Sequence, residues 1–348
     1  MAAGCWRAPA ARSGPTSIPA AVQATFAGNE ACGECHASEV NSHSRSAHAH
    51  TLRLLSHSGM GRLAPPPGNV PHTDYVLSAK DDQYVVGLPG NSDDVAPMEY
   101  ALGSGKTGIT FTSVVGGNRL AEFRMSWFPT QQKWYVTPGA ETLESEALGR
   151  VHSPEDARKC FLCHVVTLPA DKPVPEKRFF GVGCESCHGP GSAHIAAMRS
   201  GKYPDEQLQR LERWPASRLN DLCGKCHGTE QDVQLQHLPA SLTNRMQAYG
   251  LTQSRCFKQS NDSLSCISCH DPHIDASTDK TTYEAVCLTC HSAAAPANPP
   301  PHVHRTAGKP CPVNPKTGCI GCHMPARPAI PGSALPTLMT DHFIRRRP

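Results

Sequence analysis

Cysteine and histidine recur in this chain at one spacing, Cys-x-x-Cys-His, which occurs seven times. The copies begin at Cys32, Cys160, Cys184, Cys223, Cys266, Cys287 and Cys319. In this spacing two thiols can form thioethers with a porphyrin, and the adjacent imidazole can bind the iron from one face. With two cysteines each, the seven copies take 14 of the 17 cysteines, which chance does not explain. We therefore predict seven covalently attached haem c groups.

Each copy supplies two attachment cysteines and one proximal iron ligand. The predicted attachment residues are Cys32, Cys35, Cys160, Cys163, Cys184, Cys187, Cys223, Cys226, Cys266, Cys269, Cys287, Cys290, Cys319 and Cys322. The predicted proximal ligands are His36, His164, His188, His227, His270, His291 and His323.

Twelve of the 19 histidines lie outside the motifs, more than the seven needed to close the second face of every iron. Position relative to the motifs favours six as distal ligands: His48, His152, His194, His273, His304 and His342. For the seventh, His50, His302 and His237 compete, and we choose His50. His273 follows its own motif too closely to serve that haem, so we expect it on a neighbouring one. A methionine as distal ligand would raise the reduction potential of its haem, but the surplus of histidines favours imidazole ligands.

Cys256 and Cys311 fall outside both the motifs and the N-terminal region. In an oxidising compartment they could form a disulfide that closes a loop around the fifth and sixth motifs. The alternative is two buried thiols.

The elements that must position these residues are short, because the composition is rich in breakers. The chain has 32 prolines, 28 glycines and only 6% aromatic residues. Such a chain forms few long helices and buries little side-chain surface, so its haems must supply apolar mass. We predict a mainly α fold with much irregular loop, wrapped round a chain of haems, with a small β insert between the first and second motifs.

Motif spacing and composition divide the 348 residues into four parts. These are a flexible tether (1–28), a first haem module (29–70), a β-rich insert (71–145) and a six-haem domain (146–348). Within the insert we expect a strand at residues 84–86 and a hairpin of residues 109–115 and 120–128 across Gly116 and Gly117. Its expected apolar side consists of Phe111, Leu120, Phe123, Met125, Trp127 and Trp134. The insert either covers the first haems or forms a separate binding module.

Charge excludes nucleic acid as a partner. The formal charge is +3, and the propionates of seven ferric haems would bring it to about −4. Basic residues are scattered, and their one run is Arg345 to Arg347 at the C-terminus.

A periplasmic or other extracytoplasmic location is expected, because haem is attached to such motifs outside the cytoplasmic membrane. The sequence has no apolar stretch long enough to span a bilayer. Ala2-Ala3-Gly4-Cys5 resembles the end of a bacterial lipoprotein signal. Cys5 is therefore either a lipid-bearing membrane anchor or an unmodified cysteine in a flexible tail.

The residues around the later motifs also resemble a known family. Residues 183–194 (GCESCHGPGSAH), 265–273 (SCISCHDPH), 319–325 (CIGCHMP) and 340–346 (TDHFIRR) resemble bacterial multihaem cytochromes of the doubled-CXXCH type. These cytochromes are similar in haem arrangement to the nitrite reductase and hydroxylamine oxidoreductase group. The resemblance, from about Asn29 to the C-terminus, implies haems in alternating near-parallel and near-perpendicular pairs. It also implies that His194, His273 and His342 bind neighbouring haems.

These observations predict an exported heptahaem cytochrome that carries electrons along mostly bis-His haems and exchanges them with redox partner proteins, including other multihaem cytochromes. The catalytic Cys-x-x-Cys-Lys motif found in many nitrite reductases is absent from the sequence, which favours an electron carrier over an enzyme. One alternative is an oxidoreductase with one open haem, the first or second, acting on a small nitrogen or sulfur compound. Another is a subunit of a cytochrome filament, oligomer or respiratory complex.

Overall fold

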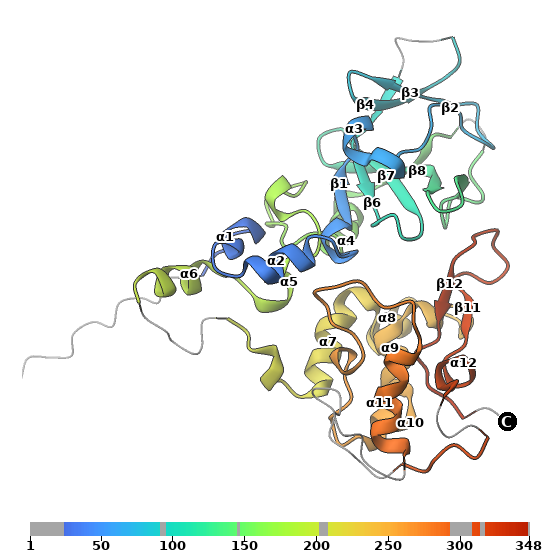
Figure 1. Ribbon diagram of the computed structural model, residues 1–348. Coiled ribbons are helices and arrows are strands. Elements are labelled where there is room, and N and C mark those ends of the chain that lie inside the picture. Colours follow the sequence, from blue (N-terminus) through green and yellow to red (C-terminus); the bar gives the residue numbers. More distant parts are fainter. Residues whose placement is uncertain are drawn as a thin grey trace, which may run out of the picture.

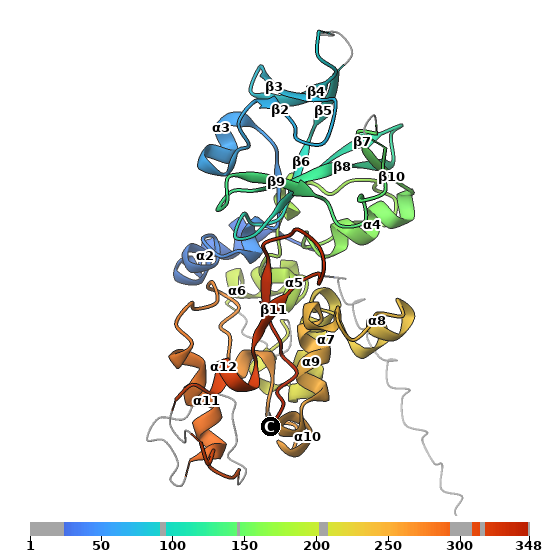
Figure 2. The same cartoon turned by 90° about the vertical axis from the view of Figure 1, so that its right-hand side faces the viewer.

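The protein was analysed as a computed structural model that describes residues 24–90, 95–144, 147–201, 208–292, 308–313 and 317–346. A β-rich part lies at one end of the molecule (Figure 1). The helices of the first and third motifs follow it, and the helices of the later motifs form the other end. A view from the side gives the same order (Figure 2). Cys5 and most of the expected tether lie outside the described residues.

The larger sheet of the β-rich part is antiparallel, with the strand order β1-β6-β7-β8-β10 and with β9 also paired to β8. Its strands are β1 (Leu52–Leu54), β6 (Tyr100–Leu102), β7 (Ile109–Val115), β8 (Arg119–Phe128), β9 (Lys133–Val136) and β10 (Gly149–His152). Strands β7 and β8 confirm the predicted hairpin. Gly116 and Gly117 in its turn have positive φ values of 59° and 84°, a conformation that glycine adopts without steric cost.

The remaining strands form two smaller sheets. One has the order β2-β3-β4-β5, and the other pairs β11 with β12 near the C-terminus. Their bounds are β2 (Gly68–Asn69), β3 (Val76–Lys80), β4 (Gln83–Gly87), β5 (Val95–Met98), β11 (Ala326–Pro328) and β12 (Leu338–Thr340). Strand β4 confirms the strand predicted at residues 84–86.

The buried apolar residues form two clusters. The first joins the two larger sheets and includes Leu77, Tyr84, Ile109 and Trp127. Of the expected apolar side of the insert, this cluster contains Phe111, Phe123, Met125 and Trp127, with Trp134 packed against it.

Leu120 belongs instead to the second cluster, together with Leu52 and Phe161. Phe161 lies in helix α4 (Pro154–Leu162). The sheet therefore packs directly on the helix that leads into the second motif.

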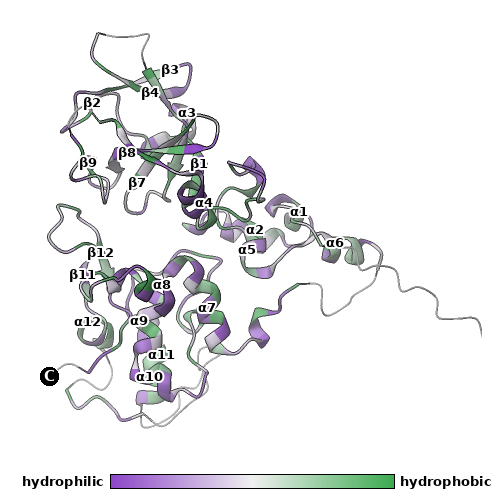
Figure 3. Ribbon diagram, turned by 180° about the vertical axis from the view of Figure 1, so that it is seen from behind, coloured by the Kyte–Doolittle hydropathy of each residue, from purple (hydrophilic) through white to green (hydrophobic). Residues whose placement is uncertain are grey.

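The remaining helices are short. They are α1 (Asn29–Gly33), α2 (Ala37–His43), α3 (His57–Met60), α5 (Cys184–His188), α6 (Ser192–Arg199), α7 (Ala216–His227), α8 (Glu230–Leu235), α9 (Gln247–Gln253), α10 (Arg255–Gln259), α11 (Thr281–His291) and α12 (Cys319–His323). Single 3₁₀ turns are η1 (His48–His50), η2 (Gly61–Leu63), η3 (Lys177–Phe179), η4 (Leu211–Arg213), η5 (Thr243–Arg245) and η6 (Cys266–Ser268). Helices α5, α7, α11 and α12 each end at the histidine of a motif. In Figure 3 helices α7 to α11 alternate between hydrophilic and hydrophobic residues along their length.

The prediction of a mainly α fold was wrong. The described residues are 35% helical and 19% strand, with several sheets. Strands β1 and β10 flank the expected insert, and β11 and β12 lie far beyond it. Each of these strands has only three or four residues, too few to show an alternating pattern in the sequence. Among the described residues no helix combines the length and apolarity needed to cross a membrane.

Candidate haem sites

Within a motif, one helical turn brings the histidine beside the two cysteines. In the first motif the carbonyl of Cys32 accepts hydrogen bonds from the N–H groups of Cys35 (3.2 Å) and His36 (2.9 Å). In the fifth motif the carbonyl of Cys266 accepts the same two bonds from Cys269 (3.2 Å) and His270 (2.9 Å). Turns of this kind present two sulfur atoms and one imidazole from five consecutive residues.

Four motif histidines each lie opposite a histidine from a distant part of the chain. The distances between ring centres are 6.5 Å for His36 and His194, 6.1 Å for His227 and His48, 6.4 Å for His188 and His273, and 6.2 Å for His270 and His342. Each distant histidine follows a different motif from the one it faces, so the pairs connect the helical parts of the molecule.

The separation within these pairs fits an iron ion between the rings. A nitrogen ligand lies about 2 Å from a first-row metal, and the ring centre lies about 1 Å beyond it, so two trans imidazoles have centres about 6 Å apart. All four pairs have this separation, and each has attachment cysteines beside its motif histidine. These residues therefore fit a bis-His haem c.

Backbone carbonyls orient the motif histidines. The Nδ1 of His164 bonds to the carbonyl of Thr51, that of His291 to Lys309 and that of His323 to Arg345, each at 2.7 Å. A carbonyl can only accept, so Nδ1 must carry the proton and Nε2 is left as the iron-binding nitrogen.

The opposing histidines are oriented in the same way. His48 Nδ1 donates to the carbonyl of Pro272 (3.3 Å), and His342 Nδ1 donates to that of Thr340 (2.9 Å). His273 Nδ1 contacts the carboxylate of Asp271 at 2.9 Å. Such partners fix the ring and raise the basicity of the nitrogen that binds the metal.

Burial favours the neutral imidazole, the form that binds iron. Removal from water lowers the pKa of His164, His227, His270 and His342 below the usual value for histidine. For His227 and His270, neighbouring histidines lower the pKa further.

The other predicted distal ligands lie elsewhere. His152 on β10 directs Nε2 to a carboxylate oxygen of Glu122 at 3.0 Å, and Arg150 binds the same oxygen. His50 lies on η1, where burial lowers its pKa and its carbonyl binds Arg53. His304 lies outside the described residues, and so does His302, a rival of His50. Within the described ranges, no histidine ring lies opposite that of His164, His291 or His323.

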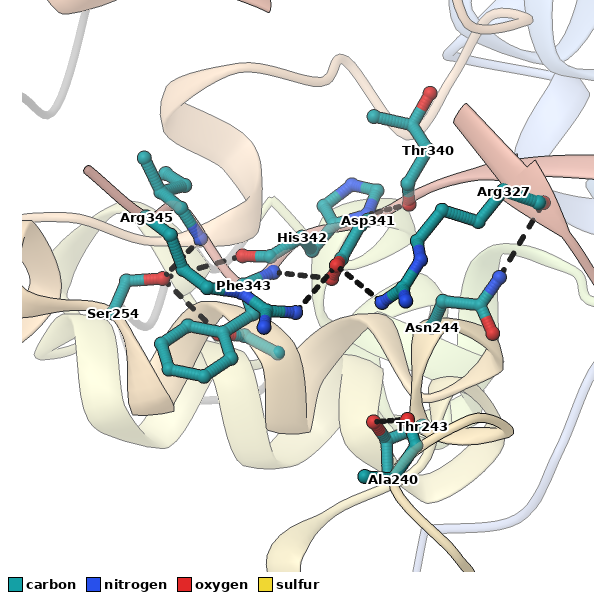
Figure 4. A network of polar contacts seen from close by, with 12 residues as sticks. Ala240, Thr243, Asn244, Ser254, Arg327, Thr340, Asp341, His342, Phe343 and Arg345 are labelled. Carbon is teal, nitrogen blue, oxygen red and sulfur yellow. Dashed lines mark hydrogen bonds and ion pairs between the residues drawn. The ribbon is translucent and has the colours of Figure 1, made fainter. Parts of the chain in front are cut away.

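A buried carboxylate near the C-terminus organises two of these sites at once (Figure 4). The side chain of Asp341 is only 4% exposed and binds Arg345 at 2.7 Å and Arg327 at 3.3 Å. It also accepts the N–H of Phe343 at 3.0 Å. The next residue after Asp341 is His342, and Arg345 supplies the carbonyl that orients His323. One short segment therefore presents an imidazole to the fifth motif and a carbonyl to the histidine of the seventh.

Ser254 attaches this segment to the rest of the molecule (Figure 4). Its hydroxyl accepts the N–H of Ile344 at 2.8 Å and contacts the carbonyls of His342 (3.3 Å) and Gly250 (3.1 Å). Because Gly250 belongs to α9, which packs on the fourth-motif helix α7, Ser254 ties the closing segment to this pair of helices.

Cysteines of different motifs lie beside one another. Burial and the neighbouring Cys184 raise the pKa of Cys32 to about 11, and burial and the neighbouring Cys319 raise that of Cys287 to about 12. The first cysteines of the fourth and fifth motifs, Cys223 and Cys266, share a hydrogen bond. A thioether does not titrate, so it is the adjacency of these sulfur atoms that bears on the haem-loaded protein.

The second cysteines of two motifs are also in contact. Cys163 and Cys226 share a hydrogen bond between the second and fourth motifs. Outside the motifs, Cys256 lies half-buried near Cys290 of the sixth motif, whereas Cys311 lies near Cys319 of the seventh. A disulfide between Cys256 and Cys311 stays a prediction.

The polar residues that hold the motifs in place were not predicted from the sequence. Besides Asp341, these are Asn29, Asn220 and Glu284, each three residues before the first cysteine of a motif. That constant offset is a signal in the sequence that could have identified them.

Comparison with known proteins agrees with this chemistry. A family model described as cytochrome c554 and c-prime matches residues 126–189. The multihaem cytochrome MtrA of Shewanella baltica (strain OS185) is 24% identical over 162 residues, which is 43% of this chain and 42% of that protein. The chain thus matches less than half the length of that relative.

Two solved structures are also similar. The outer cell wall cytochrome OcwA matches with a TM-score of 0.48 and 18% identity, over 92% of this chain and 79% of that one. The undecahaem cytochrome from the S-layer of Carboxydothermus ferrireducens matches with a TM-score of 0.44 and 16% identity, over 87% and 51%. The repeated motifs, the opposed imidazoles and the sequence matches define this chain as a multihaem c-type cytochrome.

Proposed function

We propose that this chain is a heptahaem electron carrier in which most irons are closed by two histidines. The observation that carries the proposal is the set of four opposed imidazole pairs, each at the separation that an intervening iron requires. A haem supplies one-electron redox chemistry at its iron. The protein attaches it through two cysteines, orients both imidazoles and tunes its potential through burial and hydrogen bonds.

Adjacency of the motif cysteines supports an order for the haems, which we number as their motifs occur in the sequence. Cys32 joins haem 1 to haem 3, Cys223 joins haem 4 to haem 5, and Cys287 joins haem 6 to haem 7. Cys187 lies near Cys223, and this proximity links haem 3 to haem 4. Cys287 lies near Cys269, which links haem 6 to haem 5. The main path that follows is 1-3-4-5-6-7.

Haem 2 forms a branch on this path. Its second cysteine, Cys163, contacts Cys226 of haem 4. Haem 4 then has three neighbours, and haems 1, 2 and 7 are the ends at which electrons would enter or leave. The alternating near-parallel and near-perpendicular packing implied by the family resemblance remains a prediction for these haems.

Location and partners are further parts of the proposal. The chemistry of haem attachment supports an extracytoplasmic location, where redox partner proteins, other multihaem cytochromes among them, would meet the ends of the path. A lipid anchor at Cys5 remains a prediction. For the three irons without an opposed pair, His152, His50 and His304 remain the distal ligands predicted from the sequence.

A second candidate function is oxidoreductase chemistry at haem 2. The observation that favours it is the engagement of His152 Nε2, the nitrogen that would bind an iron, by Glu122 at 3.0 Å. An iron with a free sixth position could take a small nitrogen or sulfur compound.

Electron paramagnetic resonance of the oxidised protein tests both candidates, with a pyridine haemochrome assay for the haem count. The electron carrier should contain seven haems per chain. At least four of these haems, those with opposed imidazole pairs, should give low-spin ferric signals. A high-spin signal that shifts on adding nitrite or hydroxylamine would favour the enzyme. Fewer than seven haems, or mainly high-spin iron, would contradict the proposed carrier.

A further inference from the structure

Three motif helices carry a hydrogen-bond acceptor three residues before their first cysteine. Asn29 precedes Cys32 in this way, and Asn220 precedes Cys223. The side-chain oxygen of Asn29 accepts the backbone N–H of Cys184 at 2.9 Å. That of Asn220 accepts the N–H of Cys266, also at 2.9 Å. In both cases the acceptor of one motif binds the first residue of another.

Glu284 repeats the arrangement with a longer side chain. It precedes Cys287 by three residues, and its carboxylate accepts the N–H of Gly318 at 3.1 Å and that of Ile320 at 3.5 Å. These two residues flank Cys319, the first cysteine of the seventh motif. Glu284 is buried in α11, and α11 packs against α12.

Helix geometry explains why this position recurs. Residues three apart lie on the same face of a helix, so the acceptor and the first cysteine point the same way. The first N–H groups of the partner motif have no carbonyl within their own helix, and the acceptor satisfies one of them. The contact therefore places the first cysteines of two motifs side by side, as seen for Cys32 with Cys184.

The second motif provides the internal contrast. Its residue at the same offset is Ala157, which has no side-chain acceptor. Helix α4 packs instead on strands β8 and β10. The sulfur contact of this motif to another runs through its second cysteine, Cys163, to Cys226. The motif that has alanine at the acceptor position thus contacts its neighbouring motif through its second cysteine and not its first.

We propose that the protein is built from a recurring two-motif unit in which this acceptor is a positioning residue for a pair of haems. The three units join motifs 1 and 3, 4 and 5, and 6 and 7. In each, the acceptor fixes the start of the second motif against the helix of the first, and so sets how closely two haem edges approach. The inference rests on the proposed haem loading and adds which haems are coupled most tightly.

The unit of motifs 6 and 7 gives the sharpest test, because a near-isosteric pair of variants is available. In the haem-loaded protein, Glu284→Leu removes both acceptor oxygens, whereas Glu284→Gln keeps one for Gly318. Glu155→Leu, at an exposed glutamate of α4, is the matched control. The readouts are the haem count by mass spectrometry, the Soret circular dichroism couplet that arises from coupled haem pairs, and the melting temperature.

We expect Glu284→Leu to weaken the Soret couplet and to lower the melting temperature by about 2–8 °C, the range for one or two unpaired buried N–H groups. Glu284→Gln should keep most of the couplet, and Glu155→Leu all of it. A wild-type couplet in Glu284→Leu would overturn the proposal. If neither Glu284→Leu nor Glu284→Gln accumulates with haem, the acceptor oxygen is not what matters, which also overturns it.

A second unit makes the outcome independent of one site. Asn29→Leu should weaken the couplet as Glu284→Leu does, and Asn41→Leu, an exposed asparagine of α2 that binds Arg45, should not. A wild-type couplet in Asn29→Leu would restrict the positioning role of the acceptor to motifs 6 and 7. It would thereby contradict the proposal that the two-motif unit recurs. Failure of the proposed function is distinguishable, because it would appear in the wild-type protein as missing haems.

Discussion

The β-rich part and the haem-motif part of this protein are held together by different means. Both apolar clusters consist of residues between Leu52 and Phe180. Beyond Phe180, the described buried hydrophobics are few, and half of them are alanines, such as Ala197, Ala216 and Ala248. The comparison teaches that side chains form the core of one part, whereas haems must form the core of the other.

Withholding haem should have the largest effect on this comparison. Expressed without haem attachment, the chain should lose the structure of residues 181–346 while the two larger sheets persist, because only the sheets have an apolar core of their own. Limited proteolysis with mass spectrometry should yield a resistant fragment of about residues 50–180. Equal resistance of the helical part would show that the two parts do not differ in this way.

Replacing Asp341 by asparagine should have the next largest effect. The carboxylate of Asp341 is buried but its partners Arg345 and Arg327 are partly exposed, so losing the charge should cost about 2–4 kcal/mol, less than in a fully buried pair. Release of the closing segment should also free His342 from the fifth iron, which electron paramagnetic resonance would detect as a high-spin ferric signal. The exposed Asp156→Asn is the control. A stable Asp341→Asn protein with an unchanged spectrum would show that this carboxylate positions nothing.

A cavity created by mutation in the β-rich part should lower the stability of that part alone. Leu77 is fully buried between the sheets, so Leu77→Ala should cost about 2–5 kcal/mol in the unfolding of this part. Haem content and redox potentials should stay at their wild-type values. Denaturant unfolding followed separately by tryptophan fluorescence and Soret absorbance would measure both, and a coincident loss of the two signals would contradict the separation.

The smallest effect is expected at Ser254. Ser254→Ala removes a hydroxyl that bonds to the closing segment and should cost about 0.5–1.5 kcal/mol in the haem-motif part. Thermal unfolding measured by Soret absorbance would detect it. Ser44→Ala, at an exposed hydroxyl of the N-terminal helices, is the matched control and should show no change.

Features fixed by local sequence could be predicted, and features fixed by distant contacts could not. The haem motifs need only five adjacent residues, and the hairpin of β7 and β8 has a long alternating pattern and a glycine turn. Strand β1 has three residues, and its partner β6 lies about fifty residues away, so no local pattern indicates it. Glu284 likewise acts on Gly318, 34 residues further along the chain. Its repeated offset from a motif was the one local sign of its role.

A high-resolution cryo-electron microscopy or crystal structure of the haem-loaded protein tests the central claim most directly, because it shows the sixth ligand of every iron. The account predicts that the irons bound by His36, His188, His227 and His270 are closed on the other face by His194, His273, His48 and His342 respectively. Water, methionine or a different histidine at any of these four positions would contradict it.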